Sequence, residues 1–94
     1  MTRYETIFIL RPTLGEEEMK EAVEKFKNFI ETNATVETFD EWGNRKLAYT
    51  IGEHSEGYYI FTTFESLPTF PQELERMFRI SEDVIKFIVV RKDR

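Results

Sequence analysis

Cysteine is absent from this 94-residue sequence, and histidine, glycine and proline are scarce, with one, four and three copies. Without cysteine the chain has no disulfide, no thiolate nucleophile and no cysteine metal ligand, which fits a reducing compartment. The only histidine, His54, lies in a polar segment with no metal-binding pattern of carboxylates beside it. We therefore predict no metal site and no cofactor.

The sequence also lacks the phosphate-cradling, zinc-hydrolase and serine-nucleophile motifs, namely GxxxxGK followed by Ser or Thr, GxGxxG, HExxH and GxSxG. The nearest approach to an anion-binding loop is the tripeptide RPT at 11–13, which is too short a signal to support catalysis. We predict that the protein is not an enzyme and has no small-molecule substrate.

No apolar run reaches the length of a signal peptide or of a membrane-spanning helix, and the first ten residues, MTRYETIFIL, include two charges. This pattern predicts a cytoplasmic protein with no membrane partner.

Positive charge is outnumbered, with 13 Lys and Arg against 18 Asp and Glu, for a net charge of −5. An acidic chain is a poor general binder of nucleic acid, because phosphate contacts require clustered cations. The acid is concentrated in residues 13–41, however, and the segment EWGNRKLAY at 41–49 contains two adjacent cations and the only tryptophan. A local basic surface is therefore compatible with the net charge.

Hydrophobic periodicity predicts six elements. The expected elements are a strand at 3–10, a helix at about 15–31, a strand in two pieces at 34–40 and 46–51, a strand at 57–65, a helix that begins between Pro68 and Pro71 and ends near Arg79, and a strand at 84–92. A capping box formed by Thr13 and Glu16 is expected to open the first helix. Residues 42–44, WGN, predict a bend or bulge with the indole packed for structure, and residues 52–57 predict a polar turn.

The order β-α-β-β-α-β predicts one α+β domain spanning 1–94, a ferredoxin-like split β-α-β sandwich. Its four-stranded antiparallel sheet has the order 4-1-3-2, and both helices cover one face.

Alternation along the strands then assigns the side chains to two faces. Tyr4, Thr6, Phe8, Leu10, Tyr58, Ile60, Phe64, Phe87 and Val89 are expected against the helices. The open face would carry Ile7, Ile9, Tyr59, Phe61, Ile88 and Val90. Exposed apolar patches of this size usually mark an interface, so we expect a protein partner here. The alternative is a reversed register in the first strand, which would make these residues core.

Cations are expected at both ends of this sheet. Arg3 should lie near Arg91 and Lys92, and Arg11 should meet Lys86 at the opposite end. These groups suit phosphate contacts, although strand ends also carry cations for solubility alone.

Six short motifs resemble the family of bacterial small-subunit ribosomal protein six. They are RYE at 3–5, WGNRKLAY at 42–49, GYY at 57–59, FRI at 78–80, DVI at 83–85 and VVR at 89–91. The resemblance covers residues 3 to about 92. It departs from many members at Thr50, where those members have proline.

The resemblance implies a structural protein of the 30S subunit, a translation component that binds the central domain of 16S ribosomal RNA together with small-subunit protein eighteen. It places RNA-binding residues at Arg3, Arg45, Lys46, Tyr49, Lys86 and Arg91, and places protein eighteen on the open face around Tyr59 and Phe61. Lys92 is added to the predicted RNA-binding residues because it is a cation at the same strand end as Arg3 and Arg91.

Two other functions use the same open face. The segment EGYYIFTTF is similar to the strand-three signature of the RNA-recognition motif, whose rings stack on unpaired bases. In this sequence Glu56 stands where that signature has a cation. The open face is also more apolar than a surface that stacks on bases, because it carries Ile7, Ile9, Ile88 and Val90. A homodimer through the open face, with no RNA role, is the third possibility.

Overall fold

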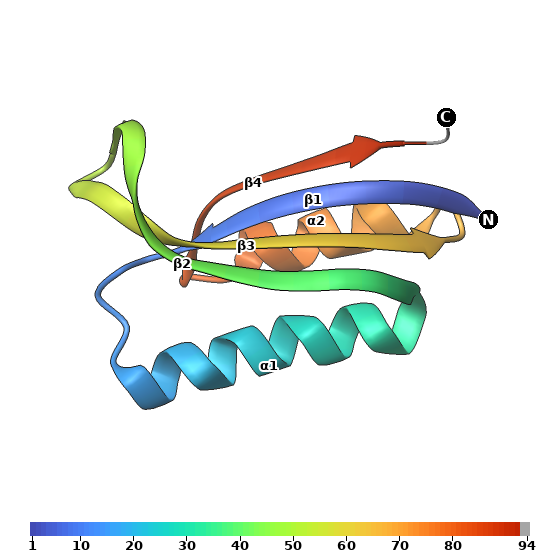
Figure 1. The fold of residues 1–94 in the computed structure, drawn as a ribbon, viewed down its shortest axis with the longest axis horizontal. Coiled ribbons are helices and arrows are strands. Elements are labelled where there is room, and N and C mark those ends of the chain that lie inside the picture. Colours follow the sequence, from blue (N-terminus) through green and yellow to red (C-terminus); the bar gives the residue numbers. More distant parts are fainter. Residues whose placement is uncertain (93–94) are drawn as a thin grey trace.

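The computed structural model describes residues 1–92 and contains six elements (Figure 1). They are β1 (Thr2–Leu10), α1 (Glu16–Asn33), β2 (Thr35–Ile51), β3 (His54–Ser66), α2 (Phe70–Ile80) and β4 (Val84–Arg91). The strands form one antiparallel sheet in the order β2-β3-β1-β4. This order is the predicted 4-1-3-2 read from the other edge, so the predicted fold is confirmed. Within the described residues, neither helix is long and apolar enough to cross a membrane.

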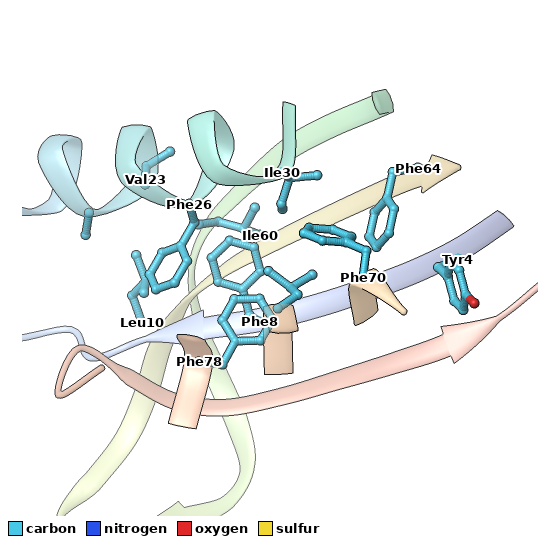
Figure 2. Packing of buried hydrophobic residues seen from close by; sticks show 12 residues of the cluster. Tyr4, Phe8, Leu10, Val23, Phe26, Ile30, Ile60, Phe64, Phe70 and Phe78 are labelled. Atoms are coloured by element: carbon cyan, nitrogen blue, oxygen red, sulfur yellow. The ribbon is translucent and has the colours of Figure 1, made fainter. Parts of the chain in front are cut away.

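Both helices pack on the same face of the sheet around a core rich in phenylalanine (Figure 2). Phe8 of β1 lies between Phe26 of α1 and Phe78 of α2, with ring centroids 5.4 and 4.7 Å away. Tyr4, Thr6, Phe8, Leu10, Ile60 and Phe64 are buried on this side, as alternation predicts. Tyr58, Phe87 and Val89 are partly buried and pack against the same core. The reversed register of the first strand is therefore excluded.

The helix α1 begins where it was predicted to begin, but its N-cap differs from the prediction. Gly15 is the N-cap, and its backbone N–H donates to the Glu18 carboxylate at 3.1 Å. Thr13 instead accepts a hydrogen bond from the Arg11 guanidinium at 2.8 Å, so the capping box predicted for Thr13 and Glu16 is wrong. Three glutamates in the first turn lie near the positive end of the helix dipole, which favours this start.

Strands β2 and β3 form one long hairpin that rises from the sheet on the side away from α1 (Figure 1). Its turn consists of Gly52 and Glu53, with φ of +59° at Gly52, and Ile51 pairs with His54. The predicted polar turn at 52–57 is therefore wrong over most of its length, because a positive φ at one glycine reverses the chain within two residues. A bulge does occur between Glu41 and Gly43, as predicted.

Candidate functional site

The strand register places the predicted open-face side chains in adjacent rows across three strands. Ile88, Ile7 and Phe61 lie side by side in one row. Lys86, Ile9 and Tyr59 form the next row toward the hairpin. Because paired residues project from the same face of a sheet, these rows form one continuous surface opposite the helices.

Trp42 also belongs to this surface, contrary to the expectation that its indole would be packed for structure. The indole is 39% exposed and stacks on the rings of Phe61 and Tyr59, with centroids 5.4 and 6.4 Å away and 15° between the planes. The bulge before Gly43, whose φ is +86°, adds one residue to β2. Residues on both sides of the bulge therefore share the open side, and simple alternation missed this.

Ile9 requires the opposite correction, because it is only 4% exposed and offers no surface to a partner. The hairpin curls over this part of the face, where Leu47 is also buried. Ile9, Leu47, Tyr49 and Lys86 line a hollow of about 140 Å³ beneath the hairpin. We therefore leave Ile9 out of the open-face set and add Trp42, and we call the resulting surface the apolar face: Ile7, Trp42, Tyr59, Phe61, Ile88 and Val90. The side chains of Ile88 and Val90 are 49% and 45% exposed.

Four of the predicted RNA-binding residues lie at the hairpin end of the sheet. The Lys86 ammonium donates to the Tyr49 hydroxyl at 2.6 Å, which joins β4 to the hairpin. Arg45 stacks on the Trp42 indole, with its guanidinium carbon 4.9 Å from the ring centroid. We call Arg45, Lys46, Tyr49 and Lys86 the hairpin group.

The two adjacent cations of the hairpin group point to different sides. Arg45 pairs with Gly57 and projects toward the apolar face, whereas Lys46 pairs with Glu56 and projects from the other side. Both side chains are exposed, so the hairpin presents cations in two directions.

The other three predicted RNA-binding residues lie at the opposite end of the sheet. The Lys92 N–H donates to the Arg3 carbonyl at 2.7 Å, so these cations are neighbours as predicted. The Arg3 guanidinium is bound to the Glu37 carboxylate at 2.9 Å. Arg91 pairs with Tyr4 and therefore projects toward the helix side. The seven residues thus form two groups and not one patch.

Arg11 and Lys86 do not bind to a common partner. Arg11 forms an ion pair with Asp83 at 3.1 Å, and its backbone N–H donates to the Asp83 carbonyl. Lys86 lies on the open side at Tyr49. At this end of the sheet, Arg11 is therefore neutralised by Asp83, whereas Lys86 keeps its charge beside Tyr49.

On the helix side of the hairpin, the Tyr58 hydroxyl donates to the Glu41 carboxylate at 2.7 Å. Partial burial, together with the hydrogen bond and the charge of Glu41, raises the pKa of Tyr58 to about 12. Tyr58 therefore remains a neutral donor at physiological pH and links β2 to β3.

No group of three His, Asp or Glu side chains within residues 1–92 is arranged to hold a metal ion.

An antiparallel sheet with helices on one face, apolar side chains on the other and cations on a projecting hairpin defines a binding and scaffolding domain of the ferredoxin-like type.

The chain is similar in sequence and in structure to known proteins of one family. A family model described as Ribosomal protein S6 matches residues 3–91. Small ribosomal subunit protein bS6 of Clostridium novyi (strain NT) is 52% identical over 95 residues, with full coverage of both chains. The bS6 protein of Caldanaerobacter subterraneus subsp. tengcongensis is 48% identical, with 99% of each chain covered. The crystal structure of 30S ribosomal protein S6 from Thermotoga maritima matches with a TM-score of 0.90 and 32% identity, covering 97% of this chain and 87% of that one.

The chain therefore belongs to the ribosomal protein S6 family. It is a structural, non-enzymatic constituent of the small subunit of the bacterial ribosome, a cytoplasmic ribonucleoprotein. The predicted family, class and location are confirmed.

Proposed function

We propose that this protein binds the central domain of 16S ribosomal RNA together with small-subunit protein eighteen. Protein eighteen covers the apolar face, and the hairpin group contacts RNA phosphates. The observation that carries this proposal is that the exposed Trp42 indole, stacked on the partly exposed rings of Phe61 and Tyr59, lies directly beside an exposed cationic hairpin.

The apolar face has the chemistry of a protein interface. Its rings and aliphatic side chains form a surface on the side that the helices leave uncovered. Aromatic side chains are enriched at interface centres because they bury much area with few rotatable bonds. The indole of Trp42, held by Phe61 and Arg45, provides a large ordered anchor at one margin.

The hairpin group has the chemistry of a phosphate contact. Arg45 and Lys46 form no ion pair with any described residue, so both charges remain available. Lys86 is bound to a neutral hydroxyl, which orients the ammonium without neutralising it. Contacts of this kind position a protein on RNA and do not read its sequence. Arg3, Arg91 and Lys92 remain a predicted second contact at the far end.

Filter binding to central-domain RNA in the presence of protein eighteen tests the RNA half of this proposal. The double variant Arg45→Ala with Lys46→Ala should bind more weakly. The slope of the logarithm of its binding constant against the logarithm of the salt concentration should become less steep by about 0.7 to 0.9 for each phosphate contact that is lost. The matched control, Lys20→Ala with Arg76→Ala, removes one lysine and one arginine from exposed helix positions.

If both double variants bind RNA like the unmodified protein, or if both lose affinity equally, the hairpin group has no specific RNA role. The control accounts for the change in net charge, which is the same in the two variants.

A further inference from the structure

The open side of the sheet carries a second chemical feature beyond the apolar face. Glu5 pairs with Thr63 and Val90, and Glu65 pairs with Arg3, so both carboxylates project from the same side as Phe61. Asp40 lies directly opposite Phe61 on β2. We call Glu5, Asp40 and Glu65 the acidic margin.

The acidic margin is not neutralised within the described part of the chain. The Arg3 guanidinium forms its ion pair with Glu37. Among the described residues, no ion pair involves Glu5, Asp40 or Glu65. Lys92 adds one cation at the outer corner, where its backbone binds Arg3. Carboxylates therefore remain in excess at this end of the open side, whereas the hairpin end carries cations.

Docking on the apolar face changes the environment of these carboxylates. Glu5 and Glu65 are already half-buried, and a partner seated on Ile7 and Phe61 covers the adjoining rows. A carboxylate that loses water without gaining a counter-charge costs several kcal/mol. A stable complex therefore needs cationic groups above the acidic margin.

We propose that the acidic margin binds arginine or lysine side chains from a basic segment of the same protein partner that covers the apolar face. This inference rests on the proposed function and specifies the partner's chemistry. Opposite charges at the two ends of the open side fix the partner's orientation, since a reversed partner would place like charges together.

Two other occupants fit the charges of the open side less well. RNA phosphates are repelled by uncompensated carboxylates. A second copy of the chain would bring its own three margin carboxylates along with Arg45, Lys86 and Lys92, so its open side has no excess of cations to offer. A cationic segment of a different protein is not limited in this way.

Isothermal titration with purified protein eighteen tests the inference. The double variant Glu5→Gln with Glu65→Gln keeps side-chain size and should bind about tenfold more weakly, with a smaller salt dependence than the unmodified protein. The matched control Glu21→Gln with Glu24→Gln removes two exposed carboxylates from α1 and should bind within about twofold of the unmodified protein.

Equal weakening in both variants, or no weakening in either, overturns the inference. A double margin variant that gains RNA affinity at unchanged affinity for protein eighteen overturns it in favour of RNA, and loss of self-association alone, measured by sedimentation, does so in favour of a second copy. Phe61→Glu separates this inference from the proposed function. If that variant binds protein eighteen normally, the proposed function fails; if it does not bind while the margin variant binds with the affinity of the unmodified protein, only the inference fails.

Discussion

Tyr58 and Glu41 show how burial and one charged hydrogen-bond partner together shift the pKa of a residue. Partial burial disfavours the tyrosinate, and the Glu41 carboxylate both accepts a hydrogen bond from the hydroxyl and repels a developing negative charge. These causes raise the pKa of Tyr58 from its ordinary value of 10 to about 12. The neutral Tyr58 hydroxyl, bound to the Glu41 carboxylate, thus joins β3 to β2 just before the hairpin leaves the sheet.

We predict that the stability of the protein at high pH depends on the ionisation of Tyr58. Below pH 10 the stabilising effect of the neutral Tyr58 is fully present, and it is lost as the pH rises toward 12. Glu41→Gln should lower the pKa of Tyr58 while leaving it above 10, because burial is the largest cause and remains. Near-UV absorbance of tyrosinate, taken as the difference from a Tyr58→Phe variant in each background, measures this pKa. An unchanged pKa in the Glu41→Gln protein would show that the carboxylate does not act on Tyr58.

The hairpin formed by β2 and β3 owes its path to close packing at its base. Gly57 is buried where β3 crosses the end of β1, and a Cβ at this position would collide with the Ile9 side chain. Ile85 and the Leu10 carbonyl lie 3.4 Å from the same point. Glycine therefore allows the hairpin to lie directly on Ile9.

At the element scale we predict that Gly57→Ala destabilises the protein by about 1 to 3 kcal/mol, as overpacking does in other cores. Combining it with Ile9→Ala, which removes the colliding methyl group, should cost less than the sum of the single changes. Urea unfolding of the two single variants and the double variant measures this coupling.

Gly15→Ala is the control for this pair. A Cβ at Gly15 meets only the Glu18 carboxylate at 3.5 Å, and its φ of −68° suits any residue. Its effect should be about 1 kcal/mol, because alanine is a weaker N-cap than glycine, and it should add to that of Ile9→Ala without coupling. Strict additivity of Gly57→Ala and Ile9→Ala would contradict the packing described for the hairpin base.

For the whole molecule, stability and binding are assigned to opposite faces of one sheet. The helix side contains the phenylalanine core, whereas the open side carries the apolar face and its charged margins. A substitution should therefore affect folding or assembly according to the face from which its side chain projects.

Phe61→Glu and Phe8→Ala test this separation. Phe61 is partly exposed outside the core, so its replacement should weaken pairing with protein eighteen while keeping a cooperative thermal transition. Phe8 is fully buried, and its truncation should cost about 3 to 5 kcal/mol. Thermal unfolding and a pull-down with protein eighteen distinguish the two effects. Loss of the thermal transition in Phe61→Glu would contradict the assignment of faces.

Much of the architecture follows from local pattern. Alternation in β1 correctly assigned Tyr4 and Phe8 to the core, and the element order predicted the sheet order. The beginning of α1 was predicted to within about one residue, but its N-cap was missed because Gly15 has no side chain with which to signal a cap. The turn at Gly52 was placed too broadly because polar residues can also form the exposed end of a hairpin.

The sequence by itself determined the order of elements, the two faces of β1 and the location of the cations, because these depend on spacing along the chain. Only the tertiary structure brought Trp42 onto the open side, covered Ile9 with the hairpin and bound Arg3 to Glu37. Each of these results depends on a bulge or on contacts between distant residues. Periodicity describes one strand at a time, whereas the surface that a partner meets depends on how all four strands are paired.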